Sequence, residues 1–278
     1  MTTRFQWDTT RTLVMGVLNV TPDSFSDGGK FFDIEHAVAH AREMAAAGAD
    51  IIDVGGESSR PGARPVSADE EWRRVIPVIE RIGDLLVSID TTKSVVAERA
   101  LAAGARIVND ISALRFDERM VEVVRDADAG VVLMHMKGTP QTMQQEAQYA
   151  QVVTEVLGFL RARVAFAVAR GIGREQIAVD PGIGFGKTVE HNLRLLARLD
   201  EFRSLGCAVM VGASRKSFID RVLTSLEGGP DRPADERLNG SLAVVAWAVA
   251  HGANVVRVHD VAETVTVVKM TEAVRQAQ

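Results

Sequence analysis

Three polar side chains, Asp90, Asn109 and Asp180, each end a short apolar run and have no basic residue directly beside them. Two carboxylates and an amide can hydrogen-bond the edge of a flat heterocycle that alternates donors and acceptors, such as the 2-amino-4-oxo edge of a pterin. A hydrogen bond to a charged group is worth roughly 1.5–3 kcal/mol, so a buried site of this kind rejects ligands that lack the matching edge. These residues predict a binding site for a small heterocycle.

A second set of side chains is suited to an anion. Its cationic members are Arg60, Lys216, Arg257 and His259. Arginine forks match phosphate oxygens. Asn19 and Asp27 lie in the segment MGVLNVTPDSFSDGG, where an apolar run breaks into a loop that ends on two glycines. Because a carboxylate with an amide is a sparse ligand shell that leaves Mg²⁺ its waters and phosphate oxygens, the pattern predicts an anion site with room for Mg²⁺.

The elements that must position these residues alternate along the chain. Apolar, β-branched runs of strand length occur at 13–20, 50–54, 85–89, 106–108, 131–134, 177–179, 208–211 and 254–258. Stretches with helical spacing of apolar residues occur at 34–47, 68–82, 94–103, 117–126, 152–169, 189–199, 238–251 and 261–277. Several of these helices stop at a glycine that can take the left-handed conformation, namely Gly48, Gly104, Gly171 and Gly252. Alternating strands and helices predict a parallel sheet.

Eight strand–helix units of roughly thirty residues favour an α/β fold of the (β/α)₈ TIM-barrel type over an open doubly wound sheet. No GxGxxG motif follows the first strand, which counts against a dinucleotide-binding fold. We expect residues 1–278 to form one domain, with 228–237 as an exposed loop. In such a barrel the carboxyl ends of the strands form the active face, so the polar residues that end nearly every strand are expected to converge on one pocket.

Composition limits the class of protein. The 278 residues are 46% hydrophobic and 25% charged, as in ordinary globular proteins. A net charge of −5 argues against a nucleic-acid partner, which requires a basic face. One cysteine, Cys207, excludes an intramolecular disulfide and favours a reducing compartment. No apolar stretch reaches membrane-spanning length and the N-terminus lacks a signal-peptide core, so we expect a cytoplasmic protein without a membrane partner.

Eight segments give the chain a resemblance to a known family. They are MGVLNVTPDSFSDGG, DVGGESSRPGA, SIDT, VNDIS, MHMKGTPQTMQ, DPGIGFGKT, GASRKSFI and RVHDV. All eight look like segments of the dihydropteroate synthase family, occur in that family's order and cover residues 15–261. One such motif is a weak indication, whereas eight in register are highly specific. Ser59 departs from the threonine of many members, but it keeps the hydroxyl and we expect little effect.

The resemblance implies an enzyme of folate biosynthesis that joins 6-hydroxymethyl-7,8-dihydropterin pyrophosphate to p-aminobenzoate, giving 7,8-dihydropteroate and pyrophosphate. By motif position, the implied pterin-binding residues are Asp90, Asn109, Asp180, Lys216 and Arg257. The implied pyrophosphate contacts are Asn19, Arg60, Arg257 and His259. The implied p-aminobenzoate pocket is Phe25, Ser59, Arg60, Pro61, Phe185, Lys216 and Ser217. The implied cofactor is Mg²⁺, held by Asn19 and Asp27. The family also implies a homodimer, and helix 261–277 carries apolar positions suited to that interface.

The family mechanism suits these residues. The C–O bond breaks first, leaving a pterin-stabilised cation, and the aryl amine then attacks. The implied catalytic residues are Asp90, Asp180, Lys216 and Arg257. The two carboxylates stabilise the cation, while Mg²⁺, arginine and histidine stabilise the departing pyrophosphate. Such catalysis is preorganised electrostatics, which accounts for the lack of a Ser-His-Asp or Cys-His arrangement in the sequence.

Four other polar residues receive supporting roles. His135 is interpreted as a strand-end histidine held by hydrogen bonds, and Glu57 as part of the loop scaffold. Asp53 and Asp110 either join the binding residues or orient them, and we expect the second.

Two alternatives stay open. A pterin-binding methyltransferase that presents methyltetrahydrofolate to a corrinoid protein would share the Asp/Asn set, but it needs no pyrophosphate site at Arg60 and Asp27. A catalytically silent pterin-binding paralogue is harder to separate, since a binding site and a catalytic site look alike. The intact segments at Asp27 and Arg60 favour an enzyme. Phe25 and Pro61 have no insertion beside them, so we expect inhibition by sulfonamides, which imitate p-aminobenzoate.

Overall fold

The strands form a closed parallel barrel. The computed structural model describes residues 3–21, 30–58, 64–143, 147–227 and 233–277. Its strands are β1 (Leu13–Asn19), β2 (Ile51–Gly55), β3 (Val87–Asp90), β4 (Ile107–Asp110), β5 (Gly130–Met134), β6 (Ile177–Asp180), β7 (Ala208–Val211) and β8 (Val255–Val258). They pair in chain order, and β8 pairs in parallel with β1, which closes the sheet. The (β/α)₈ prediction is confirmed.

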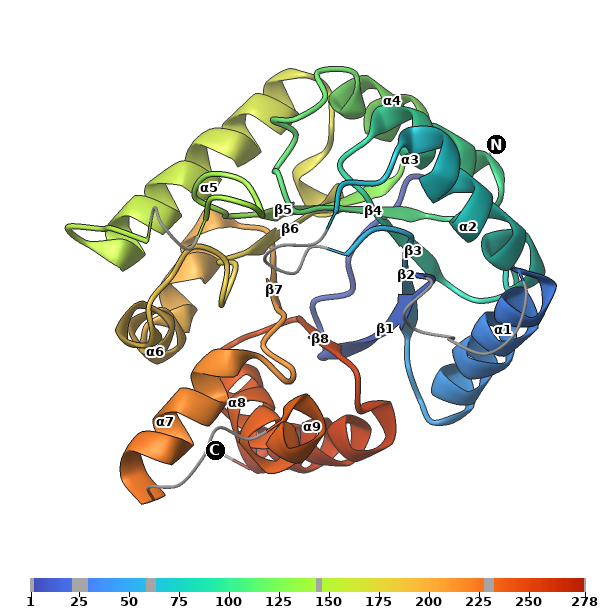
Figure 1. Cartoon of the computed structure of the whole chain (residues 1–278). Coiled ribbons are helices and arrows are strands. Elements are labelled where there is room, and N and C mark those ends of the chain that lie inside the picture. The colour runs from blue at the N-terminus through green and yellow to red at the C-terminus, as the bar shows by residue number, and fades with distance from the viewer. Residues whose placement is uncertain (1–2, 22–29, 59–63, 144–146, 228–232, 278) are drawn as a thin grey trace.

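Helices surround the barrel (Figure 1). They are α1 (Lys30–Ala46), α2 (Ala68–Arg81), α3 (Ser94–Ala102), α4 (Met120–Asp126), α5 (Val152–Ala169), α6 (Val189–Ala197), α7 (Ser217–Glu227), α8 (Leu238–Ala250) and α9 (Val261–Gln276). Short 3₁₀ helices are η2 (Arg174–Gln176), η3 (Leu199–Leu205) and η4 (Ala234–Arg237). The four glycines expected to end helices have positive φ angles between 91° and 118°.

Two apolar layers hold the barrel. The inner layer fills the barrel and includes Met15, Ile51, Ile107 and Val132, all with no exposed surface. The outer layer lies between the strands and the helices. A strand that is buried on both faces must be apolar nearly throughout, which is why the strands stand out in the sequence as continuous apolar runs.

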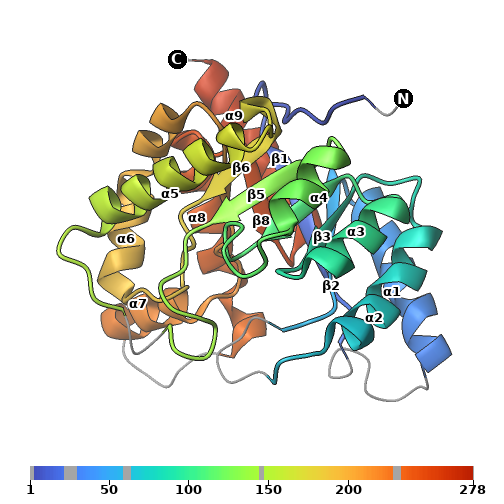
Figure 2. The ribbon, with the colours of Figure 1, turned by 90° about the horizontal axis from the view of Figure 1, so that it is seen from above.

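The N-terminal segment covers one end of the barrel. Phe5 and Trp7 pack edge to face with ring centroids 5.1 Å apart, and the indole N–H of Trp7 donates to the carbonyl of Gln176 at 2.9 Å. A Cβ atom at Gly130, the first residue of β5, would lie 2.5 Å from the Phe5 ring, so a larger residue here would require the Phe5 ring to move. The first and last described parts of the chain lie at this end (Figure 2). Gln176 and Gly130 are at the amino ends of β6 and β5, so the carboxyl ends of the strands open at the opposite end.

The sequence predictions miss one helix. All eight predicted helices occur with ends shifted by a few residues, but α7 has no counterpart among them. Helix α7 has the spacing of an amphipathic helix, with apolar residues at Phe218, Ile219 and Leu223. It is missed because it begins directly at the polar segment 214–217, which suggests a loop. The loop predicted at 228–237 also needs correction, because its last four residues form the exposed helix η4. The assignment of residues 1–278 to one domain stays a prediction.

Candidate active site

Neighbouring strands bring three predicted site residues to one edge of the barrel. Asn19 at the end of β1 is in register with Gly55 on β2, and Gly55 with Asp90 on β3. Asp90 is in register with Asn109 on β4. A Cβ atom on Gly55 would lie 3.5 Å from the Cβ of Asp90 and 3.9 Å from Oδ1 of Asn19. Glycine at position 55 therefore keeps the space between these two side chains open.

Arg257, on β8, is held over this edge by two carboxylates. Its Nε donates to Oδ2 of Asp53 at 2.6 Å, and its Nη2 donates to Oδ2 of Asp90 at 2.7 Å. The amide of Asn109 donates to the same Asp53 oxygen at 3.0 Å. Asp53 is fully buried, so its charge depends on Arg257 for compensation. As expected, Asp53 orients other site residues.

Two acceptor atoms in this network have no hydrogen-bond partner within the described residues, Oδ1 of Asp53 and Oδ1 of Asn109. Both atoms are buried, and a buried polar atom without a partner costs free energy. A ligand that brings N–H donors to the barrel mouth would remove this cost. The arrangement therefore fits a donor-bearing heterocycle.

Asp180, the last residue of β6, lies near Arg257. It is 3% exposed and its Oδ1 accepts the N–H of Gly182 at 2.7 Å. A Cβ atom on Gly212 would lie 3.9 Å from Oδ2 of Asp180 and 3.6 Å from Cβ of Arg257, so glycine at 212 leaves these two side chains room. We use the name polar floor for Asp90, Asn109 and Asp180.

Lys216 lies beside the polar floor. Its ammonium donates to the carbonyl of Ile183 and stands 4.3 Å from the centre of the Phe185 ring. Gly184, with a φ of +84°, passes close to the lysine stem, since a Cβ atom there would lie 2.8 Å from Cδ of Lys216. The loop after β6 thus brings an aromatic face and a cation together.

Burial changes the protonation of this site. Desolvation raises the pKa of Asp90 to about 7, against the opposing attraction of Arg257 and with added repulsion from Asp53. Desolvation also raises the pKa of Asp180, and the Lys216 charge limits this rise. The pKa of Lys216 falls to about 8, chiefly through desolvation. A pocket with several perturbed groups is typical of a functional site.

His135 has the structural role predicted for it. It is 6% exposed at the end of β5, and its Nδ1 lies 3.0 Å from the Nζ of buried Lys187. Lys187 also donates to the carbonyls of His135 and Phe185. Burial, followed by the nearby Lys187 charge, lowers the pKa of His135 to about 2, so the imidazole is neutral. The contacts between Lys187 and His135 hold the loop after β6 against the end of β5.

His259 directly follows β8, and Ser217 begins α7. The backbone N–H of His259 donates to Oγ of Ser214 at 3.2 Å, and its Nδ1 lies 3.1 Å from the same hydroxyl. This pairing fixes the imidazole just beyond β8. Ser217 is the exposed first residue of α7.

Of the two remaining supporting predictions, the one for Glu57 agrees with the structure and the one for Asp110 needs correction. The side-chain hydrogen bonds of Asp110 in the described residues go to the backbone of the turn after β4 and not to another site residue. Asp110 accepts the backbone N–H groups of Ser112 and Leu114 at 2.7 and 2.8 Å, which braces a turn in which Ala113 and Leu114 have positive φ. Glu57 accepts the N–H of Val66 at 2.8 Å and therefore belongs to the loop scaffold.

Five predicted site residues lie outside the described residues: Phe25, Asp27, Ser59, Arg60 and Pro61. The structure adds a cleft of about 230 Å³ next to Asp90, lined in part by Glu57, Glu71 and Lys93. The sequence does not single out Lys93 or Glu71. No local motif identifies this pair, because its members come from different parts of the chain.

The described part of the site offers few protein ligands to a metal ion. No group of three His, Cys, Asp or Glu side chains able to hold a metal occurs in the ranges that the structure describes. Asn19 offers one amide oxygen at the barrel mouth, on the same edge as Asp90. Such a sparse shell fits Mg²⁺, which keeps most of its waters and phosphate oxygens, better than it fits a metal that requires a protein cage.

A closed (β/α)₈ barrel with acidic, amide and basic side chains converging at the carboxyl ends of its strands has the architecture of a barrel enzyme. Among the helices of the described ranges, none has the length and apolar character needed to cross a membrane. Residues 15–259 match the family model described as pterin binding enzyme. The chain belongs to this pterin-binding family.

The proteins to which the chain is similar include dihydropteroate synthases from several organisms. A dihydropteroate synthase from a Synechocystis species is 46% identical over 98% of this chain and 92% of its own length. Among solved structures, a Yersinia pestis dihydropteroate synthase in complex with a sulfonamide drug has a TM-score of 0.89 at 41% identity, covering 97% of this chain and 96% of that one. A Xanthomonas albilineans dihydropteroate synthase with 4-aminobenzoic acid has a TM-score of 0.89 at 42% identity, covering 98% and 99%.

Proposed function

We propose that this protein is a dihydropteroate synthase, which condenses 6-hydroxymethyl-7,8-dihydropterin pyrophosphate with p-aminobenzoate to give 7,8-dihydropteroate and pyrophosphate in folate biosynthesis. The observation that carries the proposal is the polar floor of Asp90, Asn109 and Asp180, with Arg257 held above it by Asp53 and Asp90. Family membership and the closely similar synthases support the same activity.

The pterin is assigned to the polar floor, Lys216 and Arg257. Carboxylate and amide oxygens there accept its N–H groups, and the Lys216 ammonium donates to its ring acceptors. The Arg257 guanidinium is planar and fixed by two hydrogen bonds, so it can pack flat on the ring.

The second substrate and the leaving group are assigned to the rim. We assign p-aminobenzoate to Phe185, Lys216 and Ser217, with Phe25, Ser59, Arg60 and Pro61. The Phe185 ring beside the Lys216 cation suits an aromatic carboxylate. We assign pyrophosphate to Asn19, Arg60, Arg257 and His259. Arg257 lies on β8, and His259 is the first residue after that strand.

The proposed reaction is an ionisation followed by addition. The bond between the pterin methylene and the pyrophosphate oxygen breaks, and its electron pair leaves with pyrophosphate. The lone pair of the aryl amine then forms the C–N bond, and the nitrogen loses a proton. Asp90 and Asp180 stabilise the positive charge on the pterin, whereas Arg257 and His259 stabilise the leaving group. Charges that are already fixed in position need little reorganisation during this step.

We also propose Mg²⁺ at Asn19 and Asp27. When bound there, it would neutralise charge on the pyrophosphate oxygens and so make pyrophosphate a better leaving group.

A homodimer and a cytoplasmic location complete the proposal. Helices α8 and α9 pack on each other and expose Trp247, Met270 and Val274, which are 46%, 64% and 53% exposed. Exposed apolar side chains on adjacent helices are suited to an interface between two copies of the chain. The single cysteine supports a reducing compartment.

The test is pyrophosphate release and dihydropteroate formation from the dihydropterin pyrophosphate and Mg²⁺, with and without p-aminobenzoate. Product formation that depends on p-aminobenzoate supports the synthase. Pterin binding without turnover would instead identify a catalytically silent pterin-binding paralogue. Absence of pterin binding would contradict the assignment of the polar floor.

A further inference from the structure

The loop after β6, residues 181–186, holds two of the residues assigned to the pterin. The N–H of Gly182 donates to Oδ1 of Asp180 at 2.7 Å. The carbonyl of Ile183 accepts from the ammonium of Lys216. The shape of this loop therefore decides where one carboxylate and one cation of the site stand.

The sequence of the loop does not by itself favour one conformation. Three of its six residues are glycines with positive φ, namely Gly182, Gly184 and Gly186. Glycine loses more conformational freedom on ordering than any other residue, so the loop needs contacts with other elements to keep one shape. Its middle has two such contacts, because Asn192 accepts the N–H of Gly184 at 2.7 Å and the Tyr149 hydroxyl donates to the carbonyl of Gly186 at 3.0 Å.

Both ends of the loop are fastened to one residue, His135, which directly follows β5. At the start of the loop, the N–H of His135 donates to the carbonyl of Asp180 at 2.9 Å. At its end, the Nζ of Lys187 lies 3.0 Å from Nδ1 of His135 and 3.3 Å from its carbonyl oxygen. Since β5 and β6 are neighbours in the barrel (Figure 1), His135 is placed to join the two ends.

Lys187 matches these acceptors with its donors. It is 5% exposed, and its Nζ also lies 2.9 Å from the carbonyl oxygen of Phe185. Three acceptors thus surround an ammonium group, which has three N–H donors and no acceptor. The ring nitrogen that receives such a donor is unprotonated, in agreement with the neutral imidazole of His135.

The burial of Lys187 is costly. Its contacts in the described ranges are two carbonyls and an imidazole rather than a carboxylate, and a buried charge without a close counter-ion costs free energy. Desolvation accordingly lowers the pKa of Lys187 well below its usual value, against the attraction of the Asp180 charge. Such a cation is a poor means of stabilising the fold, so its value lies in the shape that it gives the loop.

We propose that His135 and Lys187 are positioning residues for the pterin. Their contacts close the loop after β6 into the shape that holds Asp180 and Lys216. This inference rests on the proposed function, which assigns those two residues to the pterin. His135 and Lys187 are themselves assigned to no substrate, so their effect on the ligand passes through the loop.

Two substitutions of His135 separate its acceptor from its shape. His135→Asn places a carbonyl oxygen at the position of Nδ1 and so keeps a partner for Lys187. His135→Leu has the same branched shape as asparagine but no acceptor. Both variants lose the rest of the ring, so the difference between them reports the contact with Lys187.

Lys187→Met removes the ammonium and keeps most of the side-chain stem. It leaves three acceptors without their donor, so its free energy of unfolding must be measured alongside by urea denaturation. The pair His135→Asn and His135→Leu carries the test if Lys187→Met does not fold.

Gln176→Met is the matched control. Gln176 is buried just before β6, where its amide donates to the carbonyl of Ala129 at 2.8 Å and accepts the N–H of Gly173 at 2.7 Å. Its replacement also removes buried hydrogen bonds beside β5 and β6, but at their amino ends and away from the loop after β6. A general weakening of this side of the barrel would appear in this variant too.

The first readout is the Kd of a pterin that lacks the pyrophosphate, measured by titration calorimetry. We expect this Kd to rise about five- to ten-fold in His135→Leu and Lys187→Met, because the carboxylate and the cation are displaced rather than removed. His135→Asn and Gln176→Met should stay within about two-fold of the wild type. Equal Kd values in His135→Leu and His135→Asn, or an equal rise in Gln176→Met, would overturn the inference.

Hydrogen exchange of the Gly182 amide is the second readout, since this N–H binds Asp180. Faster exchange in His135→Leu and Lys187→Met, with wild-type exchange in Gln176→Met, supports the inference, and unchanged exchange contradicts it. Neither readout needs turnover. If the wild-type protein binds the pterin but forms no dihydropteroate, the proposed synthase fails and the Kd values still decide the inference. If the wild-type protein does not bind the pterin, both fail.

Discussion

Arg257 and Asp53 are joined by a 2.6 Å hydrogen bond between strands that are not neighbours in the barrel. β1 lies between β8, which carries the arginine, and β2, which carries the aspartate. The bond therefore passes β1 on the inside of the barrel and, with the bond from Arg257 to Asp90, fixes a cation beside the polar floor. Because Asn109 donates to the same aspartate oxygen, one buried carboxylate fixes two residues of the pocket.

Asp53→Asn should weaken this arrangement without changing its volume. We expect the free energy of unfolding to fall by about 1–3 kcal/mol, since a hydrogen-bonded buried charge is lost, and the pterin Kd to rise with it. Urea denaturation and calorimetric titration measure the two effects. Asp84→Asn, in an exposed ion pair with Arg42, should change neither. Wild-type pterin affinity in a folded Asp53→Asn protein would show that the Arg257–Asp53 hydrogen bond is not needed for pterin binding.

Pterin binding should depend on pH through Asp90. Burial raises the pKa of this carboxyl to about 7, so it is largely protonated below that pH and a carboxylate above it. The carboxylate is the better acceptor for a pterin N–H, so affinity is expected to increase as pH rises through about 7. Above about 8, loss of the Lys216 proton is expected to reverse the trend, because the pKa of that ammonium falls to about 8.

Titration calorimetry with a pterin that lacks the pyrophosphate, over about pH 5.5 to 9.5, covers both titrations. Asp90→Asn should remove the rise in affinity through about pH 7 and leave the decline above about pH 8. Asp53→Asn should move the midpoint to lower pH, because the repulsion that helps to raise the Asp90 pKa is removed. A midpoint that is the same in wild-type and Asp90→Asn proteins would assign the titration to another group.

Asp180→Asn is expected to impair binding while the protein stays folded. The asparagine oxygen can still accept the N–H of Gly182, so the turn after β6 is retained. Loss of a charged acceptor is worth roughly 1.5–3 kcal/mol, or about ten- to one-hundred-fold in pterin Kd. Asp220→Asn is the matched control, because Asp220 is also buried but lies in α7 away from the polar floor. Equal pterin affinity in the Asp180→Asn and Asp220→Asn proteins would contradict the assignment of Asp180.

Sulfonamides should inhibit competitively with p-aminobenzoate. They share its aryl amine and an anionic group, which fit the aromatic face of Phe185 and the Lys216 cation. We expect sulfamethoxazole to raise the apparent KM for p-aminobenzoate and to leave the turnover number unchanged. Initial rates measured at several concentrations of sulfamethoxazole and of p-aminobenzoate distinguish competitive from other inhibition. Turnover that is unaffected by millimolar sulfamethoxazole at low p-aminobenzoate would refute the shared pocket.

The strand ends are predictable from the sequence because burial makes each strand an apolar run, and the first polar residue after it stands out. Asp90, Asn109 and Asp180 are found in this way, and their register brings them to one face. Contacts between side chains on different strands of the barrel produce no comparable pattern in the sequence. The Arg257–Asp53 bond joins residues 204 positions apart, and only the closed sheet brings them together.

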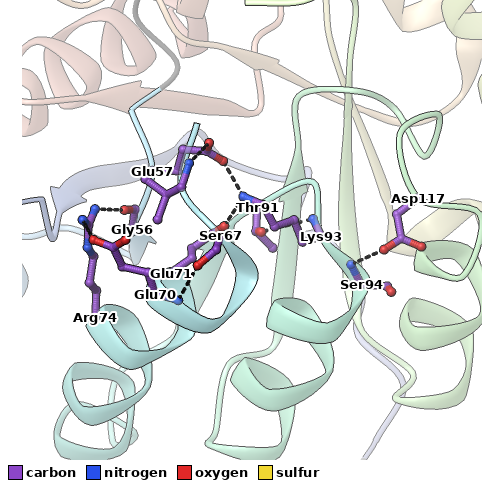
Figure 3. Close-up of polar contacts among 11 residues, drawn as sticks. Gly56, Glu57, Ser67, Glu70, Glu71, Arg74, Thr91, Lys93, Ser94 and Asp117 are labelled. Atoms are coloured by element: carbon purple, nitrogen blue, oxygen red, sulfur yellow. Dashed lines mark hydrogen bonds and ion pairs between the residues drawn. The ribbon is translucent and has the colours of Figure 1, made fainter. Parts of the chain in front are cut away.

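Two features are not predicted from the sequence, for different physical reasons: the ion-pair cluster of Glu57, Lys93 and Glu71 (Figure 3) and helix α7. Lys93 lies 36 residues from Glu57 and 22 from Glu71, and the three residues belong to different elements, so no helical or strand periodicity relates them. Helix α7 does have helical spacing, but it begins directly at the polar segment 214–217, which suggests a loop. Side-chain contacts between elements can thus be predicted only once the fold is known. Helix α7, in contrast, can be predicted from the sequence by a closer count of its apolar positions.

Two glycines should respond in opposite ways to the same substitution. Gly182 has a φ of +68°, and a Cβ atom there would lie 1.9 Å from the carbonyl oxygen of His135. Gly182→Ala therefore combines backbone strain with a clash against backbone, and we expect a loss of at least about 2 kcal/mol in the free energy of unfolding. Pterin affinity should fall too, because the Gly182 N–H orients Asp180.

Gly158 is the matched position, exposed within α5, where an added Cβ atom would have no described atom within 4 Å. Alanine loses less backbone entropy than glycine when a helix forms, so Gly158→Ala should raise the free energy of unfolding by about 0.5–1 kcal/mol. Urea denaturation of both variants beside the wild type measures the difference. Pterin affinity should stay unchanged in Gly158→Ala, and a Gly182→Ala protein as stable as the wild type would show that the turn after β6 can move away from His135.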